Sequence, residues 1–173
     1  KALGVETKPV VIGPFTLLKL LRYTEKKTEK DFLEQAVSAY KAYVERFVSL
    51  GAKWIAFDEA YLVRDLEKED LELFTALYQG ILSVKGSTKV ILQTYFVRDA
   101  YESILALPFD GVGLDFLEGK ETKALVAKGF PKDKLLFAGL VNGKNIWRNH
   151  YEKTVQEVKD LVAKGISVVL STS

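Results

Sequence analysis

The sequence predicts an α/β fold, a (β/α)8 TIM-type barrel that is incomplete, with about six parallel strands and intervening helices. Six short apolar segments recur along the 173 residues, and a segment with helical periodicity follows each of them except the last. No glycine-rich phosphate-binding turn follows any of these strands, which disfavours the simplest nucleotide-binding open sheet. The series also ends on a strand, as an eight-unit barrel would if it were cut after six units.

The first unit begins with the apolar segment KPVVIGP, residues 8–14, which we expect to form a short buried strand ending in a turn at Gly13 and Pro14. The following helix is predicted to begin at Thr28–Asp31, because a threonine with an acid three residues later is a common N-terminal cap. Gly51 is expected to end this helix. Its predicted apolar stripe consists of Leu33, Ala36, Val37, Tyr40, Val44, Phe47 and Val48.

The second unit combines the strand KWIAFDEA, residues 53–60, with a helix that stops near Gly86. This strand is apolar until its polar end, and the helix repeats apolar residues every three or four positions. The expected buried face of the helix consists of Leu71, Phe74, Leu77, Tyr78, Ile81 and Leu82.

The remaining units repeat the alternation of strand and helix. Strands are predicted at residues 89–96, 110–116, 134–140 and 166–173. The helices between them are predicted at Tyr101–Leu107, at Ala124–Ala127 and on a face formed by Val155, Val158, Leu161 and Val162. Because the strands are apolar on both faces, we expect a parallel sheet that is covered on both sides.

The composition restricts the function classes that are open to this chain. With 25 Lys and Arg against 23 Asp and Glu, the net charge of +2 predicts no nucleic-acid or acidic-membrane partner. The chain has no cysteine and one histidine, so it offers neither a disulfide framework nor an ordinary zinc site. No apolar run approaches the roughly 20 residues that cross a bilayer, and no signal-peptide pattern is present, so a cytoplasmic protein is expected. Because methionine is absent, we interpret the chain as part of a longer reading frame.

Polar residues follow the predicted strands at their carboxyl ends, where the loops of a parallel barrel converge on one mouth. Asp58 and Glu59 end the second strand, Tyr95 ends the third and Asp115 the fourth. Neighbouring strand residues point to opposite sides, so at most one of Asp58 and Glu59 faces the barrel axis. In one interpretation, one carboxylate accepts hydrogen bonds from loop amides and the other pairs with a cation such as Arg64. In the other, Asp58 binds the ammonium or ring nitrogen of a ligand.

The polar segment NGKNIWRNH, residues 142–150, follows the fifth strand. Asn142 with the glycine after it predicts a turn. Trp147 is expected to pack under the loop, and His150 to be solvated near the start of a helix. The fork of Arg148 suits a carboxylate or phosphate, although pairing with a neighbouring acid is the alternative. No serine or cysteine has a partnered base in the sequence, so covalent catalysis has little support.

Several segments of the chain, in their order and spacing, resemble the amino-terminal half of cobalamin-independent methionine synthase. They are KPVVIGPFTLL, GAKWIAFDEAYLVRDL, ILQTYF, GVGLDF, AGLVNGKNIWRNHYEK and VVLSTS. The resemblance covers essentially the whole chain, and the element around NGKNIWR is specific to this half of the family. It implies two barrels set face to face, with residues 1–173 forming a single domain that is part of the amino-terminal barrel.

The resemblance also implies an activity and a cofactor for the full-length enzyme. The family transfers a methyl group from 5-methyltetrahydrofolate polyglutamate to homocysteine, and zinc makes the homocysteine thiolate reactive. The zinc ligands of the family belong to the carboxyl-terminal barrel, so we expect this chain to bind no metal. Asp58 and Glu59 match the start of the D-E-P-A motif, which helps to bind the amino acid in the catalytic barrel, but Ala60 replaces the proline.

These observations predict a non-catalytic portion of a zinc-dependent methyltransferase. Its expected partners are the carboxyl-terminal catalytic barrel of the same polypeptide and, in the full enzyme, homocysteine and 5-methyltetrahydrofolate polyglutamate. The alternatives are a stand-alone small-molecule-binding barrel and a thiol methyltransferase of the same superfamily. No catalytic residue is predicted in this chain. The candidate substrate-binding residues at the barrel mouth are Asp58, Glu59, Tyr95, Asp115, Asn142 and Arg148.

Overall fold

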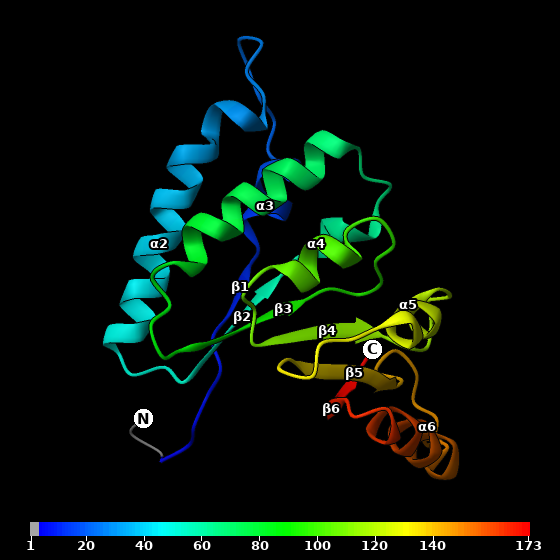
Figure 1. Cartoon of the computed structure of the whole chain (residues 1–173). Helices are drawn as coiled ribbons and strands as arrows, with labels where there is room; N and C mark the ends of the chain where they lie inside the picture. The colour runs from blue at the N-terminus through cyan, green and yellow to red at the C-terminus, as the bar shows by residue number, and fades with distance from the viewer. Residues whose placement is uncertain (1–3) are drawn as a thin grey trace.

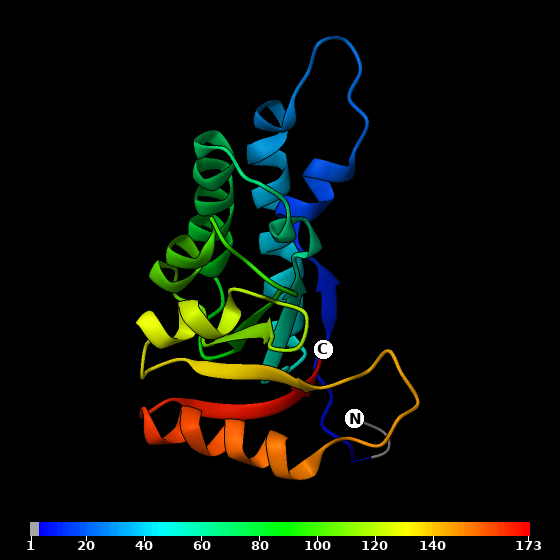
Figure 2. The ribbon, with the colours of Figure 1, turned by 90° about the vertical axis from the view of Figure 1, so that its right-hand side faces the viewer.

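The computed structural model describes residues 4–173, which form a six-stranded sheet with helices packed on one face (Figure 1). The strands lie in the order β1-β2-β3-β4-β5-β6, and all neighbouring strands are parallel. A strand order that never reverses brings every right-handed crossover helix to the same face, as in a barrel and unlike a doubly wound sheet. Figure 2 shows the sheet curling with its helices on the outside. The predicted fold class is confirmed as a partial barrel.

The strands are β1 Val10–Ile12, β2 Trp54–Asp58, β3 Lys89–Gln93, β4 Gly111–Asp115, β5 Leu135–Val141 and β6 Ser167–Thr172. The α-helices are α1 Pro14–Leu20, α2 Leu33–Ser49, α3 Lys68–Leu82, α4 Tyr101–Ala106, α5 Thr122–Lys128 and α6 Tyr151–Ala163. Two short 3-10 helices, η1 Glu29–Phe32 and η2 Ala60–Val63, precede α2 and α3. Among the described residues, every helix is too short or too polar to span a bilayer.

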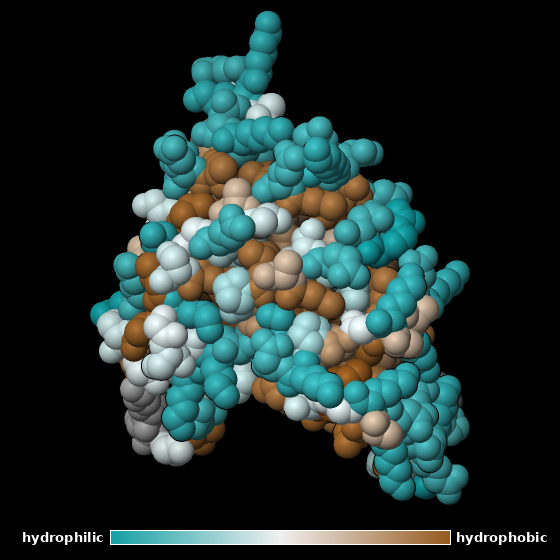
Figure 3. Space-filling model, viewed as in Figure 1, coloured by the Kyte–Doolittle hydropathy of each residue, from teal (hydrophilic) through white to brown (hydrophobic). Residues whose placement is uncertain are grey.

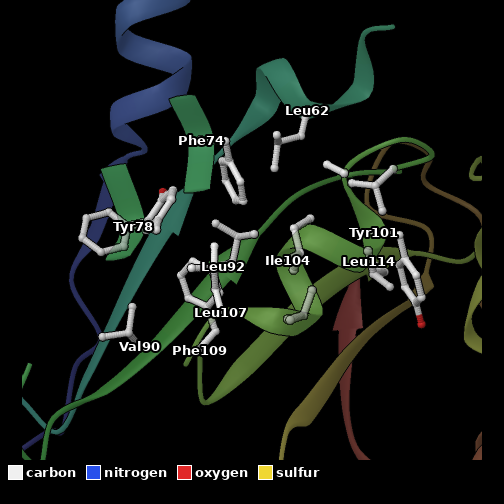
Figure 4. Packing of buried hydrophobic residues seen from close by; sticks show 14 of the residues in the cluster. Leu62, Phe74, Tyr78, Val90, Leu92, Tyr101, Ile104, Leu107, Phe109 and Leu114 are labelled. Carbon is white, nitrogen blue, oxygen red and sulfur yellow. The ribbon is translucent and has the colours of Figure 1, made fainter. Parts of the chain in front are cut away.

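The main hydrophobic core lies between the convex face of the sheet and the helices. Figure 3 views this helical side, where hydrophilic residues cover the projecting ends and hydrophobic residues show over the centre. Beneath this surface, Val90 and Leu92 of β3 pack with Phe74 and Tyr78 of α3 and with Ile104 of α4 (Figure 4). Each such fully buried apolar side chain contributes about 1.5–3 kcal/mol of transfer free energy. The apolar stripes predicted for α2 and α3 face this core, as expected.

The helices of residues 4–173 all lie on the convex face (Figure 2), so the prediction of cover on both sides is wrong for the part of the chain that the structure describes. Instead, side chains from well-separated strands meet across the barrel interior. The rings of Trp54 on β2 and Phe137 on β5 contact edge to face, with centroids 6.3 Å apart. Gly111 of β4 leaves the necessary room, because a Cβ atom there would lie 2.8 Å from the Phe137 ring. In the same way, a Cβ atom at Gly113 would lie 2.0 Å from Gln93 Oε1.

The amino-terminal end of α2 follows the predicted cap, but a 3-10 turn separates the cap from the helix. Thr28 N donates to Asp31 Oδ2 at 2.7 Å, and the reciprocal bond from the Asp31 amide also forms. The residues after this capping box form η1, and α2 begins at Leu33. The helix ends at Ser49, just before Gly51, as predicted.

Two expectations about the first unit are wrong. Among the described residues β1 pairs with β2 alone, and Val10 of this edge strand is 63% exposed in place of being buried. Pro14 starts helix α1 in place of the expected turn, since its fixed φ suits the first helical position.

In α6, Leu161 faces the sheet, but Val155 and Val162 are exposed. The ion pair of Lys123 with Glu157 places α5 on one flank of α6, and Val155 and Val162 lie on the opposite flank, beyond edge strand β6.

Candidate functional site

Glu59 is fully buried behind the end of β2, away from the barrel mouth. Its carboxylate accepts hydrogen bonds from Phe15 N at 3.1 Å, Thr16 N at 2.7 Å, Thr16 Oγ1 at 2.6 Å and the Tyr78 hydroxyl at 2.6 Å. Burial raises the pKa of Glu59 to about 7, and the four hydrogen bonds partly oppose that rise. We call these groups the Glu59 knot, which ties the first turn of α1 to β2 and α3. Glu59 is therefore the carboxylate of the Asp58–Glu59 pair that accepts hydrogen bonds from backbone amides.

Asp58 points to the other side of β2, toward the concave face, since Phe57 before it faces the helices. Its Oδ1 atom is inaccessible to solvent and has no hydrogen-bond partner within residues 4–173. Burial raises the pKa of this carboxyl group. The interpretation that pairs it with Arg64 is not realised in the described residues, where Arg64 is exposed. Gln93 lies beside Asp58 in the register of β2 with β3.

Asp115 is buried at the end of β4, where it fixes the loop that leads to α5. Its Oδ1 accepts hydrogen bonds from Leu117 N at 2.7 Å and Glu118 N at 3.0 Å. Its own backbone N donates to the carbonyl of Tyr95 at 2.5 Å, whereas the Tyr95 side chain is exposed. The geometry of Asp115 is therefore that of a loop-stabilising acceptor.

The segment after β5 folds into a loop that uses its asparagines internally. Asn142 Oδ1 accepts hydrogen bonds from the backbone N of residues 144 and 145 at 2.8 and 3.1 Å, which is the predicted turn. Asn145 Oδ1 accepts from Trp147 N at 3.0 Å. Lys144 Nζ reaches Glu118 Oε2 at 2.6 Å and so ties this loop to the β4–α5 loop.

Trp147 does not pack under the loop, which corrects the expectation from the sequence. Its side chain is 77% exposed, and that of Ile146 is 94% exposed. The loop projects from the body of the molecule (Figure 2), which leaves the indole largely open to solvent. Arg148 places its guanidinium over the Tyr151 ring, 5.5 Å from the centroid. His150 is exposed just before α6, as expected.

Asn142 and Arg148 contribute to a hollow of about 400 Å³ between this loop and the first turns of α6. We call it the α6 groove, and Asn145, Trp147, Lys153 and Glu157 also line it. The other four predicted residues lie elsewhere: Glu59 behind the sheet, Asp58 on the concave face, and Tyr95 and Asp115 at the neighbouring loop. The sequence analysis did not select Lys153, which also lines the groove. Its position one turn into a helix that starts near His150 could have indicated that it lies close to the loop before that helix.

The described residues do not fit a zinc site. The chain has no cysteine, and His150 is its single histidine. Within residues 4–173, no three His, Asp or Glu side chains gather closely enough to hold a metal ion. Zinc in proteins takes three or four such ligands, so no step of any reaction is assigned to a metal held by this chain.

The consecutive parallel strands, the helices on the convex face and the polar carboxyl ends define the class of (β/α) barrel proteins. Residues 1–165 match the family described as "Cobalamin-independent synthase, N-terminal domain", and the chain belongs to this family.

Its relatives include proteins named 5-methyltetrahydropteroyltriglutamate–homocysteine methyltransferase. Identity is 49% with the Streptococcus suis protein (strain 05ZYH33), 48% with that of Lactococcus lactis subsp. cremoris (strain SK11) and 47% with that of Campylobacter jejuni (strain RM1221). Each alignment covers 100% of this chain and 23% of the relative, so the chain spans less than a quarter of their length.

Proposed function

We propose that this chain forms part of the amino-terminal barrel of a cobalamin-independent methionine synthase with two barrels. The whole enzyme would transfer a methyl group from 5-methyltetrahydropteroyltriglutamate to homocysteine. In that enzyme this chain is a scaffold that supports the catalytic barrel and carries no chemistry of its own. The observation that carries the proposal is the alignment of 47–49% identity along the complete chain with proteins that bear that name.

The distribution of polar groups supports a scaffold role. Glu59 and Asp115 have their hydrogen-bonding partners inside the chain, so both serve the fold. No three potential metal ligands gather among residues 4–173, and in this proposal the carboxyl-terminal barrel of the whole enzyme would hold the zinc. Of the candidates on the concave face, Asp58 is the one with an unpartnered carboxylate oxygen. We assign Asp58 to a contact with a group outside the described residues.

The exposed tip of the β5–α6 loop supports the presence of a partner surface. Ile146 and Trp147 turn apolar side chains outward while the loop's asparagine oxygens are used within it. Exposed apolar side chains presented by an ordered loop are typical of contact surfaces. We propose that this tip packs against the remainder of the same polypeptide, the carboxyl-terminal catalytic barrel.

A chimera tests the scaffold role. The aligned segment of the full-length Streptococcus suis relative is replaced by these 173 residues, and methyl transfer to homocysteine is measured together with zinc content. We expect the chimera to keep activity and zinc, and the 173-residue chain alone to show neither. Stoichiometric zinc or methyl transfer in the chain alone would overturn the proposal. So would a folded, zinc-loaded chimera without activity, because a pure scaffold should be exchangeable at this level of identity.

A further inference from the structure

The α6 groove is lined by several polar and charged side chains that the stability of the fold does not explain. It lies at the carboxyl end of β5, between the 142–150 loop and the first turns of α6, and has a volume of about 400 Å³. That volume lies at the lower end of the range of small-molecule sites. The groove is separate from the Glu59 knot and from the unpartnered carboxylate of Asp58.

Hydrogen-bond donors are in excess in this groove. The oxygens of its three asparagines are used by partners within the loop and α6: Asn142 and Asn145 accept backbone N–H groups, and Asn149 accepts from Thr154 Oγ1 at 3.2 Å. The amide orientations of Asn142 and Asn145 follow from these bonds, because a side-chain nitrogen cannot accept from a backbone N–H group. The Nδ2 groups of these two asparagines are therefore left as donors with no partner among the described residues.

Positive charge adds to these donors. Within residues 4–173, Arg148 and Lys153 form no ion pair, although both line the groove. Helix α6 has no side-chain cap at its amino terminus, so its first-turn N–H groups also remain available. The acid in the lining, Glu157, pairs through Oε1 with Lys123 Nζ at 2.7 Å, which offsets its charge. Its Oε2 atom has no partner within residues 4–173, but it is inaccessible to solvent and therefore does not add an acceptor to the open surface of the groove.

We propose that the α6 groove binds a small carboxylate-rich anion, a di- or tricarboxylate whose oxygens accept from the asparagine amides, Arg148 and Lys153. A guanidinium and an ammonium supply the charge-assisted bonds, and the amides give several directed donors to a compact polyanion. The exposed indole of Trp147 forms one wall of the groove. The proposal concerns binding by this chain alone and does not depend on the methyl-transfer proposal.

The indole also provides the measurement. The chain has two tryptophans, and Trp54 packs in the barrel interior against Phe137. In the Trp54→Phe variant, Trp147 is the single tryptophan and its fluorescence reports on the groove. We titrate this variant with tricarballylate, with glutarate and with propionate at constant ionic strength. The expected result is a saturable change that is strongest for the tricarboxylate, weaker for the dicarboxylate and absent for the monocarboxylate.

Matched variants locate the binding. Arg148→Gln and Lys153→Gln should each weaken tricarballylate binding about tenfold, the loss of one charge-assisted hydrogen bond. Lys159→Gln, an exposed position of α6 outside the groove, should leave it unchanged. In ¹H–¹⁵N spectra, which do not depend on the Trp54 variant, the asparagine side-chain NH₂ signals of the loop should shift on titration.

Three results would overturn the proposal. One is no saturation up to about 10 mM tricarballylate, a concentration that exceeds the Kd of even weak specific sites. Another is an equal response to propionate at the same ionic strength. The third is an equal loss of affinity in Lys159→Gln and Arg148→Gln, which would indicate nonspecific screening by α6.

Discussion

The Glu59 knot and the 142–150 loop both follow the carboxyl end of a barrel strand, but they use their polar groups in opposite ways. In the knot, a buried carboxylate gathers two backbone amides and two hydroxyls and holds three elements together. In the loop, the amide oxygens stabilise the backbone locally, and the apolar side chains Ile146 and Trp147 face outward. Position at the barrel mouth therefore does not define a role. The partners of each polar atom separate a residue that stabilises the fold from a surface that is available for contact.

The largest expected effect is the loss of the knot in Glu59→Ala. The substitution leaves four buried donors without an acceptor and should lower the free energy of unfolding by about 4 kcal/mol. Urea denaturation measures this loss. Glu45→Ala, at an exposed position of α2, is the matched control and should change stability little. Equal effects of the two substitutions would mean that the knot does not differ from an exposed carboxylate.

Gly13→Ala should break the same knot by steric conflict. A Cβ atom at this position would lie 2.0 Å from Glu59 Cδ, so the carboxylate must move away from α1. We expect a loss of about 3 kcal/mol in urea denaturation, as in other overpacked sites. In the double variant with Glu59→Ala the conflict disappears, and the combined loss should fall well below the sum of the single losses. Simple additivity would contradict this explanation.

The stability of the chain should depend on pH through Glu59. Its pKa is raised to about 7 in the folded chain from the ordinary value of 4.5, so the folded state binds this proton more tightly than the unfolded state. The corresponding stability is complete below the ordinary value and is lost as pH rises through about 7. The loss should be about 3 kcal/mol in urea titrations at successive pH values. Glu59→Gln should remove this part of the dependence of stability on pH. If the variant and the unchanged chain showed the same dependence, Glu59 would not be its source.

The smallest expected effect concerns the loop. Trp147→Ala should change the free energy of unfolding by less than about 0.5 kcal/mol, because the side chain is 77% exposed and buries little apolar surface. The matched substitution Trp54→Ala removes a ring that packs in the barrel interior and should cost about 3 kcal/mol. Thermal or urea unfolding separates the two. A large loss for Trp147→Ala would mean that the tryptophan packs onto the chain, and the contrast between loop and knot would fail.

The sequence predicts the elements well because periodicity is a local property. The apolar repeats of α2 and α3 and the capping box at Thr28 and Asp31 are set by neighbouring residues, and the structure confirms them. The alternation of side chains along β2 does not by itself decide whether Asp58 or Glu59 faces the helices. A signal was nevertheless present, since the strand alternates large Ile55 and Phe57 with small Ala56, and the larger residues face the helices.

Exposure could not be predicted where it depends on distant neighbours. Trp147, Val155 and Val10 have the apolar character of core residues, yet each lies at a loop tip, on an outer helix flank or on an edge strand. Their surroundings are set by which elements stand beside them in space, and that information is absent from local periodicity. The donor excess of the α6 groove is likewise visible only once the hydrogen bonds of each asparagine are known.

The two glycines of β4 restrict which substitutions can be accepted on the neighbouring strands β3 and β5. Because Gly111 and Gly113 contribute no side chains to the barrel interior, Phe137 and Gln93 occupy the space in front of them. A larger residue at either glycine would then be accepted only together with a smaller one at its partner position on β5 or β3. Among homologous barrels, positions 111 and 137 should therefore vary as one pair and positions 93 and 113 as another, although the members of these pairs lie 26 and 20 residues apart in the chain.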